Sequence, residues 1–237
     1  MKNLLKTEDY NSLSETDFTR VVYDELSDMV YIENPIPSIY EWVDLGLPSG
    51  TKWSTTNVGA SVPEEYGLYF AWGEVNGYKL NDPNIKTFCK EYKYGEPDLF
   101  FSKTIYDKYN ETDMLTQLEL IDDAAYVSDN TSVIPTSAQC MELIENTVRT
   151  EEVLNNVEGK RFTSKTNGNS IFIPYYEHIT CDENQKNEIC IHGNECYGIW
   201  TNTFSHIEIS FMFYLKNNSV DGNLRWCGAP IRPVKRQ

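Results

Sequence analysis

Two adjacent carboxylates, Asp122 and Asp123, are the first side chains in this sequence whose types suit catalysis. Paired acids hydrolyse glycosidic bonds when one protonates the leaving group and the other acts as nucleophile or base. Asp122 and Asp123 lie in a segment of helical periodicity, where adjacent side chains point about 100° apart. Side chains that diverge by this angle cannot flank one scissile bond. We therefore predict that one of the two acids makes a buried structural hydrogen bond and that the other faces solvent.

A second group combines thiols and an imidazole in the segment CDENQKNEICIHGNEC, with the spacing C-x8-C-x-H-x3-C: Cys181, Cys190, His192 and Cys196. These are ligand types that zinc favours, but the segment lacks the C-x2-C pair that makes zinc motifs specific. We therefore favour a loop insertion with incidental thiols and predict no metal. A zinc site and a Cys190–Cys196 disulfide are the two alternatives.

The other candidate residues form no active-site pattern in the sequence. His206 has no Ser or Cys nucleophile nearby in the chain, and Gly46, Gly50 and Gly59 punctuate turns without forming a phosphate-binding loop. The sequence also has no D-x-D-x-D-G calcium loop. We expect a protein that is not an enzyme and that uses no cofactor.

The charge of the chain excludes some partners. Twenty Lys and Arg stand against 36 Asp and Glu, which gives a net charge of −16 over 237 residues. Such a chain repels nucleic-acid phosphates and anionic lipid, so we expect no nucleic-acid partner. No segment approaches the ~20 consecutive apolar residues of a membrane span, so we expect no membrane insertion.

The N-terminal sequence MKNLLKTEDYN lacks the apolar stretch of a signal peptide, because Glu8 and Asp9 follow directly. We therefore expect a protein without a signal peptide that is made in the cytoplasm. The six cysteines are spread over a long chain, which favours reduced thiols in that compartment.

The first elements that must position any site lie at the N-terminus. Residues 14–31 have the spacing of an amphipathic helix with Ser14 as its N-cap. The apolar positions recur at intervals of three and four residues: Phe18, Val22, Leu26 and Met29. This stripe either packs on its own domain or serves oligomerisation and docking to a larger assembly. Pro35 and Pro37 then favour an extended connector, so we divide the chain into an arm at 1–38 and a domain at 39–237.

The domain contains signals for both strands and helices. A Gly/Pro turn predicts a pair of strands at 43–53, and 67–73 reads as a buried aromatic strand. Helices are expected at 117–127, with Leu118, Ile121 and Ala125 on one side, and at 135–148 with Thr136 or Ser137 as the cap. Asn167-Gly168 predicts a hairpin turn. The remaining expectations are an irregular loop at 76–113 and strands at 197–203, 207–216 and 224–234.

Several of these segments together resemble a known family. The segment WVDLGLPSGTKWSTTNVGASVPEEYGLYFAWGE at 42–74 is similar to the opening of the C-type-lectin-like domain called the Fibrobacter succinogenes major paralogous domain. Bacteroidetes and their phages carry this domain, which shares the fold of formylglycine-generating enzyme. Further matches are Asp122 to Ala125, Pro135, Thr136, Leu143, Asn167, Gly168, Ser170, Ile171, Phe172, Pro174 and Arg232 to Val234. The resemblance implies an α+β fold: a C-type-lectin-like domain with a twisted antiparallel sheet, two helices and long loops, after a short helical arm.

The resemblance also suggests where a ligand would bind. In this family the C-terminal part follows a Tyr-Trp-Ser-Ser-like strand, matched here from Tyr197 to Asn202, and displays variable residues on an exposed face. Aromatic and amide side chains suit ligand capture, because rings stack and amides both donate and accept hydrogen bonds. We predict the contact residues Tyr197, Asn202, Thr203, Ser205, His206, Asn217, Asn218, Asn223 and Arg225. We predict that Trp200 and Trp226 lie in the core.

The resemblance implies recognition in place of catalysis. We expect a phage virion component, such as a head fibre, decoration protein or tail adhesin. It would be a homo-oligomer whose arm docks to other virion proteins and whose head contacts a host-surface glycan or protein. The alternative is a bacterial surface or cytosolic binding protein of the same family. A formylglycine-type oxidase is the least favoured, because Cys227 is alone near the C-terminus and Cys196 lies far upstream.

Overall fold

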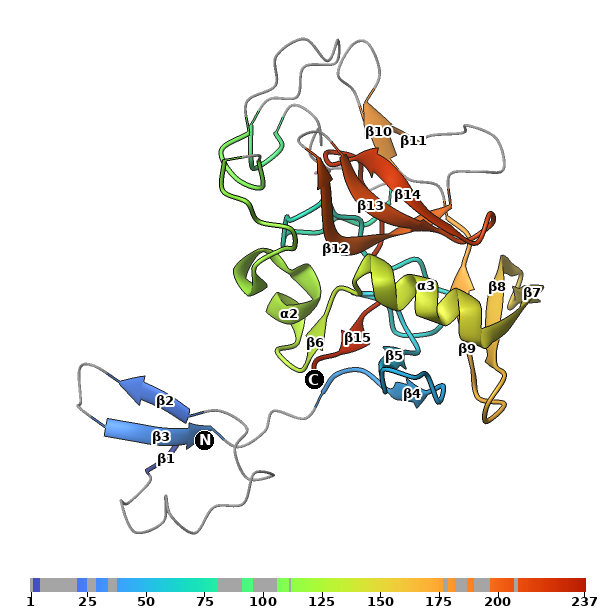
Figure 1. The fold of residues 1–237 in the computed structure, drawn as a ribbon, viewed down its shortest axis with the longest axis horizontal. Coiled ribbons are helices and arrows are strands. Elements are labelled where there is room, and N and C mark those ends of the chain that lie inside the picture. Colours follow the sequence, from blue (N-terminus) through green and yellow to red (C-terminus); the bar gives the residue numbers. More distant parts are fainter. Residues whose placement is uncertain are drawn as a thin grey trace. The chain divides into compact units, whose positions relative to one another are not determined.

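The chain consists of two compact units, Met1–Ile39 and Tyr40–Gln237, in a computed structural model. The described residues are 2–4, 21–24, 29–33, 38–80, 91–95, 106–110, 112–176, 179–181, 187–189, 197–206 and 209–237. This part of the chain combines antiparallel strand pairs with two α-helices, which makes it an α+β structure (Figure 1).

The N-terminal unit is built from strands where it is described. β1 (Lys2–Leu4), β2 (Val21–Asp24) and β3 (Met29–Glu33) form an antiparallel sheet in the order β1-β3-β2. The predicted helix over 14–31 is therefore wrong at 21–24 and 29–31. The physical reason is local composition, because VVYD and MVYIE are rich in β-branched and aromatic residues.

The four apolar residues predicted to form a docking stripe on one helix are affected by this correction. Val22 lies on β2 and Met29 on β3, two antiparallel strands, so the two residues do not share one continuous helix. Phe18 and Leu26 lie outside the described residues. The four positions consequently do not form the expected helical surface.

Three antiparallel sheets dominate the larger unit. The first joins its two ends in the order β4-β5-β15-β6, from β4 (Trp42–Asp44), β5 (Lys52–Ser54), β15 (Val234–Lys235) and β6 (Ser132–Val133). The second contains β7 (Thr147–Leu154), β8 (Val157–Ser164) and β9 (Ser170–Pro174). The third contains β12 (Gly198–His206), β13 (Ile209–Tyr214) and β14 (Ser219–Leu224). A short pair is formed by β10 (Ile179–Cys181) and β11 (Asn187–Ile189).

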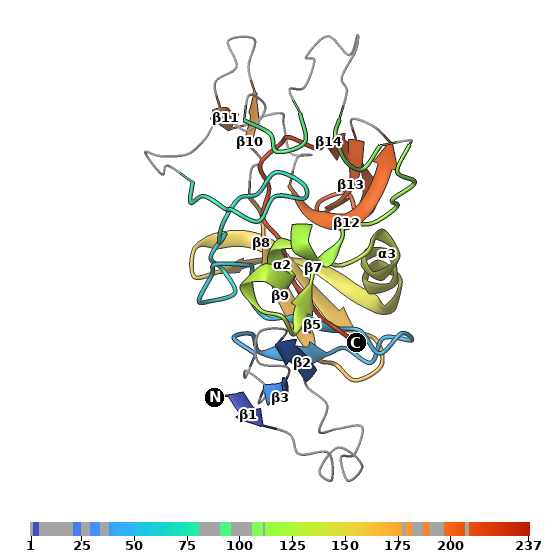
Figure 2. The same cartoon turned by 90° about the vertical axis from the view of Figure 1, so that its left-hand side faces the viewer.

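The helices of this unit lie between its sheets. η1 (Leu120–Asp122), α2 (Ala124–Ser128) and α3 (Ser137–Asn146) occupy the middle of the unit in both views, with β12–β14 on one side and β4–β5–β15–β6 on the other (Figures 1 and 2). α3 contacts all three strands of the β12–β13–β14 sheet and also β7 and β8. It therefore joins the two larger sheets.

The start of α3 confirms the predicted cap. The Thr136 hydroxyl accepts a hydrogen bond from the Gln139 N–H at 3.0 Å, and the Gln139 side chain accepts one from the Thr136 N–H at 2.9 Å. This reciprocal pair is a capping box, which satisfies two N–H groups that the helix itself leaves without partners.

The segment predicted as one helix at 117–127 is divided. Asp123 adopts an extended conformation (φ −93°, ψ 106°) between η1 and α2 and caps α2 by accepting from the Tyr126 N–H. This break turns the apolar positions away from one common face. Leu118 and Ala125 are buried, but Ile121 is 71 % exposed, so the prediction that these three residues lie on one side is wrong.

Two expected strands are irregular in the structure. Phe70 and Tyr69 are buried within 67–73 as predicted, but they form only isolated bridges, with Ala229 and Tyr78. The strand expected over 224–234 is limited to the end of β14 at Leu224 and to β15. Between them the chain crosses the core, where its residues are buried by side-chain packing without a continuous ladder.

The predicted hairpin turn is confirmed, and a second one was not predicted. Asn167-Gly168 lies between β8 and β9, and Gly168 has φ +77°. β7 and β8 are joined by the two-residue turn Asn155-Asn156, with φ values of +48° and +66°. Two positive φ values define a type I′ turn, which asparagine tolerates better than other non-glycine residues.

The conformation of Asn156 yields a stability prediction. Asn156→Val is expected to lower the free energy of unfolding by about 1–2 kcal/mol, because a β-branched side chain is strained at positive φ. Asn156→Gly is expected to be neutral or stabilising, since glycine adopts this conformation freely. Urea denaturation measures both, with Glu158→Val in the regular strand β8 as the control. Equal stability of the two Asn156 variants would contradict the assigned turn.

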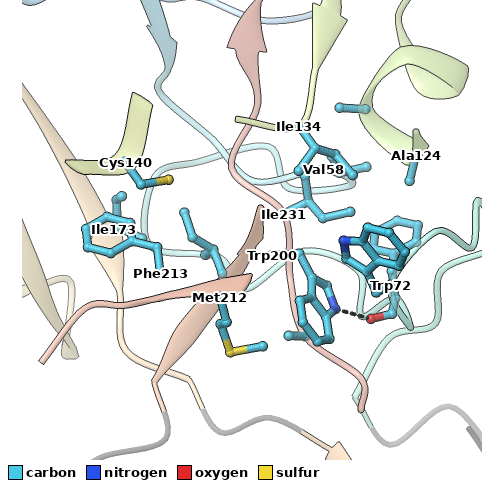
Figure 3. Close-up of a cluster of buried hydrophobic side chains, with 14 of the residues drawn as sticks. Val58, Trp72, Ala124, Ile134, Cys140, Ile173, Trp200, Met212, Phe213 and Ile231 are labelled. Carbon is cyan, nitrogen blue, oxygen red and sulfur yellow. Dashed lines mark hydrogen bonds between the residues drawn. The ribbon is translucent and has the colours of Figure 1, made fainter. Parts of the chain in front are cut away.

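The core of the larger unit confirms the two predicted tryptophans. Trp200 and Trp226 are each 1 % exposed, and Trp53 and Trp72 are buried with them. The Trp200 indole N–H donates to the Phe70 carbonyl at 2.8 Å, which ties β12 to the irregular segment (Figure 3). The Trp200 indole therefore holds the irregular segment as well as filling volume.

Candidate functional site

The nine predicted contact residues do not form one surface. Tyr197 lies beside the β13–β14 turn, since the Leu215 N–H donates to its carbonyl at 2.8 Å. At the far end of the same sheet, His206 pairs with Ile209 and Asn223 with Ser210. β12 is bulged, and its partner β13 spans the same two ends with six residues, which separates them by about 17 Å at the usual rise of a strand. One small ligand cannot contact both ends.

Asn202 and Thr203 hold other elements in place. Asn202 is 9 % exposed, its N–H donates to the Pro135 carbonyl, and its carbonyl accepts from the Leu118 N–H. The Thr203 hydroxyl accepts from the Ser137 N–H at 3.0 Å, at the start of α3. Both residues therefore position α3 and its approach, while Ser205 is half-buried and His206 exposed.

Arg225 is not a surface contact, so its prediction as one is wrong. It is fully buried, and its guanidinium carbon lies 4.5–6.0 Å from the centroids of six rings: Trp72, Tyr92, Tyr94, Tyr106, Tyr109 and Phe204. Its nitrogens donate to the carbonyls of Lys108 and Tyr109 and to the Tyr92 hydroxyl. We call these seven residues the arginine cage. It fixes the loops at 91–95 and 106–110 against the end of β14.

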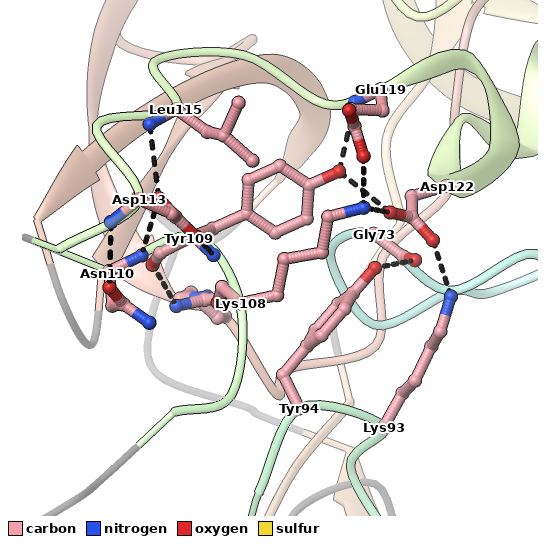
Figure 4. Close-up of polar contacts among 11 residues, drawn as sticks. Gly73, Lys93, Tyr94, Lys108, Tyr109, Asn110, Asp113, Leu115, Glu119 and Asp122 are labelled. Atoms are coloured by element: carbon pink, nitrogen blue, oxygen red, sulfur yellow. Dashed lines mark hydrogen bonds and ion pairs between the residues drawn. The ribbon is translucent and has the colours of Figure 1, made fainter.

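Asp122 forms an ion-pair network next to the arginine cage (Figure 4). The ammonium groups of Lys93 and Lys108 and the Tyr109 hydroxyl all donate to its carboxylate. Burial alone would raise the pKa of Asp122, but these hydrogen bonds outweigh it and lower the pKa to about 2. Asp122 is therefore a permanently charged structural group at neutral pH.

Asp123 is buried as well, which corrects the prediction that one of the two acids faces solvent. Its carboxylate accepts from the backbone N–H groups of Tyr126 and Ile134. Burial raises the pKa of Asp123 to about 6, and these N–H groups only partly offset that rise. Because each acid is engaged by its own structural partners, the pair is not a catalytic dyad.

Three of the predicted residues do meet, at the β13–β14 turn. The rings of Tyr175 and Tyr197 stack with centroids 5.2 Å apart and planes at 28°. The Lys216 ammonium lies over both rings, at 5.6 and 5.2 Å from the centroids. Asn217 is exposed next to it, and Asn218 follows in the left-handed conformation at φ +53°. We call these five residues the Tyr197 ledge.

Hydrogen bonds to Lys160 and Glu151 hold the Tyr197 ledge in place. Asn218 accepts a hydrogen bond from the Lys160 ammonium at 3.1 Å, and Lys160 is only 3 % exposed. The Tyr175 hydroxyl donates to Glu151, and burial followed by this contact raises the pKa of Tyr175, so the hydroxyl stays protonated. The ledge is thus ordered before any ligand arrives, which lowers the entropic cost of binding.

The Tyr197 ledge offers chemistry that suits a polar ligand. Lys216 supplies a cation and hydrogen-bond donors, Asn217 supplies donors and an acceptor, and Tyr197 supplies a half-buried ring. This combination can bind a sugar or a polar protein surface. The sequence alone does not single out Tyr175, Lys216 or Lys160, because only the tertiary structure brings Tyr175 and Lys216 to Tyr197 and Lys160 to Asn218.

The described part of the chain offers neither a metal site nor a membrane-spanning helix. There, no group of three or more His, Cys, Asp and Glu side chains is placed to hold a metal ion. Of the four candidate zinc ligands, Cys190, His192 and Cys196 lie outside the described residues, and of Cys181 only the strand position is described. None of the described helices has the length and apolar character to cross a membrane.

Comparison of the chain with family models, with curated proteins and with solved structures finds no match. The resemblance to the C-type-lectin-like domain therefore stays a prediction from the sequence.

Proposed function

We propose that this chain is a non-enzymatic binding and display protein whose larger unit, of C-type-lectin-like fold, contacts a host-surface glycan or protein through the Tyr197 ledge. The observation that carries this proposal is the ordering of the ledge. The Lys216 ammonium lies over the stacked rings of Tyr175 and Tyr197, and the exposed Asn217 follows it in the turn. Glu151 holds Tyr175, and Lys160 holds Asn218. Ordered aromatic and polar groups of this kind are typical of recognition surfaces.

The proposed setting is a phage virion, where the protein would be a head fibre, decoration protein or tail adhesin. The support is the resemblance of the sequence to a domain that phages of Bacteroidetes carry. In this setting the N-terminal unit, with β1, β2 and β3, would dock to other virion proteins or to further copies of the chain. The alternative is a bacterial surface or cytosolic binding protein with the same ledge. An oxidase is less well supported, since Cys227 is a buried thiol.

Quantitative proteomics on density-purified phage particles tests the setting. The proposal expects the chain at a fixed ratio to the major capsid protein. Its absence from particles, with recovery in the cell envelope or cytosol, would favour the alternative.

Variants on a printed glycan library and on intact host cells test the ledge. Asn217→Ala and Lys216→Ala are each expected to weaken binding about tenfold, which corresponds to about 1.4 kcal/mol, because each removes a hydrogen-bonding group, exposed at Asn217 and half-buried at Lys216. His206→Ala, at the opposite end of the sheet, is the matched control and should bind as the parent does. Loss of binding in His206→Ala with normal binding by both ledge variants would refute the assignment.

A further inference from the structure

Lys160 is a buried lysine with an unusual set of neighbours. It lies in the middle of β8, its side chain is 4 % exposed, and its ammonium donates to the Asn218 Oδ1 and to the Lys216 carbonyl, each at 3.1 Å. The Glu151 Oε1 lies 3.3 Å from the same nitrogen. An amine, a carboxamide and a carboxylate thus meet at one point, from parts of the chain up to 67 positions apart in number.

The strand register brings these three groups together. Glu151 on β7 pairs directly with Lys160 on β8, so both side chains lie on one face of the sheet. Phe162 lies on the same face two residues later and packs edge-on against Phe213 of β13, at 5.7 Å between ring centroids. The turn that follows β13 consequently places Asn218 over Lys160.

The geometry is close to that needed for attack by the amine on the side-chain amide. The Lys160 Nζ lies 3.1 Å from Oδ1, and a carbonyl bond measures about 1.2 Å, so Nζ is within about 4.3 Å of the Asn218 Cγ. Reacting atoms in a near-attack arrangement are about 3–3.5 Å apart. Attack requires the amide to turn its Cγ toward the amine from this hydrogen-bonded position, and the Tyr175 hydroxyl holds the Glu151 carboxylate beside the amine.

We propose that the folded chain joins Lys160 to Asn218 through an intramolecular isopeptide bond, with Glu151 as the proton carrier. Glu151 accepts a proton from the ammonium, which leaves the nucleophilic neutral amine. The bond from Nζ to Cγ forms, the bond from Cγ to Nδ2 breaks, and Nδ2 leaves as ammonia with protons delivered through Glu151. The ammonia is protonated in water, so charge is conserved and no oxidant or other reactant is required.

The bond would link β8 to the β13–β14 turn, and with it two sheets of the larger unit. Such a cross-link closes a loop of the chain and limits the unfolded state, as a disulfide does, without depending on a redox compartment. The proposed bond does not depend on the proposed ligand. It involves Lys160 and Asn218, which hold the Tyr197 ledge in place, and not the exposed side chain of Asn217.

Intact mass spectrometry of the denatured full-length chain tests this proposal. The parent is expected to be lighter than its sequence mass by one ammonia, and Lys160→Arg and Asn218→Ala are expected at full mass. Glu151→Gln should remain mostly at full mass after the parent has reacted completely. Asn218→Asp should lose one water in place of ammonia, because condensation with a carboxyl group releases water. Circular dichroism checks that each variant is folded.

Tryptic digestion then locates the bond, since a succinimide at Asn167-Gly168 would also release one ammonia. The isopeptide bond blocks cleavage after Lys160 and yields one branched peptide that joins residues 150–161 to residues 217–225. Recovery of the free peptides 150–160 and 217–225 from a folded parent would overturn the proposal. In that case Lys160 would be a lysine satisfied by hydrogen bonds alone.

Discussion

Replacing Arg225 by alanine is expected to lower the free energy of unfolding by about 4 kcal/mol or more. The side chain is fully buried and donates to the carbonyls of Lys108 and Tyr109 and to the Tyr92 hydroxyl. Each acceptor left without a donor costs about 1–3 kcal/mol, and the truncation also opens a cavity among six rings. Desolvated cation–π contacts contribute further, about 2 kcal/mol in favourable cases.

The chemical reason for the effect can be separated from the loss of volume. Arg225→Lys keeps the charge and most of the stem, but an ammonium cannot reproduce the planar fork that serves three acceptors in different directions. It is therefore expected to lose more than half of the stability that Arg225→Ala loses. Arg161→Lys is the matched control, since Arg161 pairs with Glu152 near the surface, where such a pair is worth roughly 1 kcal/mol or less.

Chemical denaturation with tryptophan fluorescence measures these differences, because Trp72 lies in the arginine cage and Trp226 follows Arg225. A stability of Arg225→Lys equal to that of the parent would show that charge alone, and not hydrogen-bond geometry, holds the cage. Equal effects of Arg225→Ala and Arg161→Lys would show that the cage contributes little.

The sequence predicted those elements that are determined by residues close together in the chain, such as a helix cap or a two-residue turn. Thr136 with Gln139 three residues later is a capping box by sequence, and α3 starts there. Asn167-Gly168 forms a turn almost independently of its surroundings, because few other pairs adopt its backbone angles. Trp200 could be assigned to the core because a large apolar ring gains most from burial.

The N-terminal prediction failed because two patterns coincide in a short segment. Apolar residues at intervals of three and four, from Phe18 to Met29, satisfy a helix template. The same segment contains Val21, Val22 and Tyr23, whose side chains favour strands, and β2 forms there. The segment forms a strand because it has a pairing partner: Val22 pairs with Tyr31 on β3. The periodicity of a short segment does not show whether such a partner exists.

Arg225 and the Tyr197 ledge depend on tertiary contacts that no local pattern specifies. The prediction of Arg225 as a contact rested on the exposed C-terminal face that the family resemblance implies, and arginine is seldom buried. The available signal was the four tyrosines at 92, 94, 106 and 109, whose rings need partners for both their faces and their hydroxyl groups. The Tyr197 ledge could not be predicted, because it forms only where the turn after β13 returns to Tyr197. The strand register shows this return, and the sequence does not.

The neighbouring acids Asp122 and Asp123 are expected to give opposite pH dependences of stability. The pKa of Asp122 is lowered to about 2, so its carboxylate contributes stability above the unfolded pKa near 3.8, which is lost as pH falls toward 2. The pKa of Asp123 is raised to about 6, so its contribution is fully present below 3.8 and is lost as pH rises through 6. Two adjacent residues thus favour different ends of the pH range.

Variants at the two positions make this contrast measurable. At pH 7, Asp122→Asn is expected to be less stable than the parent by on the order of 2 kcal/mol, because one amide cannot accept from both Lys93 and Lys108. This difference should shrink below pH 4. Relative to Asp123→Asn, the parent should gain on the order of 2 kcal/mol between pH 7 and pH 4, because only the parent takes up a proton at that site.

Urea denaturation from pH 3 to pH 8 for the parent and both variants provides the test, with Asp107→Asn at an exposed position of the nearby loop as a control for general charge effects. Parallel stability curves for all four proteins would contradict the assigned protonation states. Opposite slopes would show why neither acid is available for chemistry: Asp122 is held charged by two lysines, and Asp123 is held by backbone N–H groups in a site that disfavours its charge. Each carboxylate is committed to the structure before a substrate could use it.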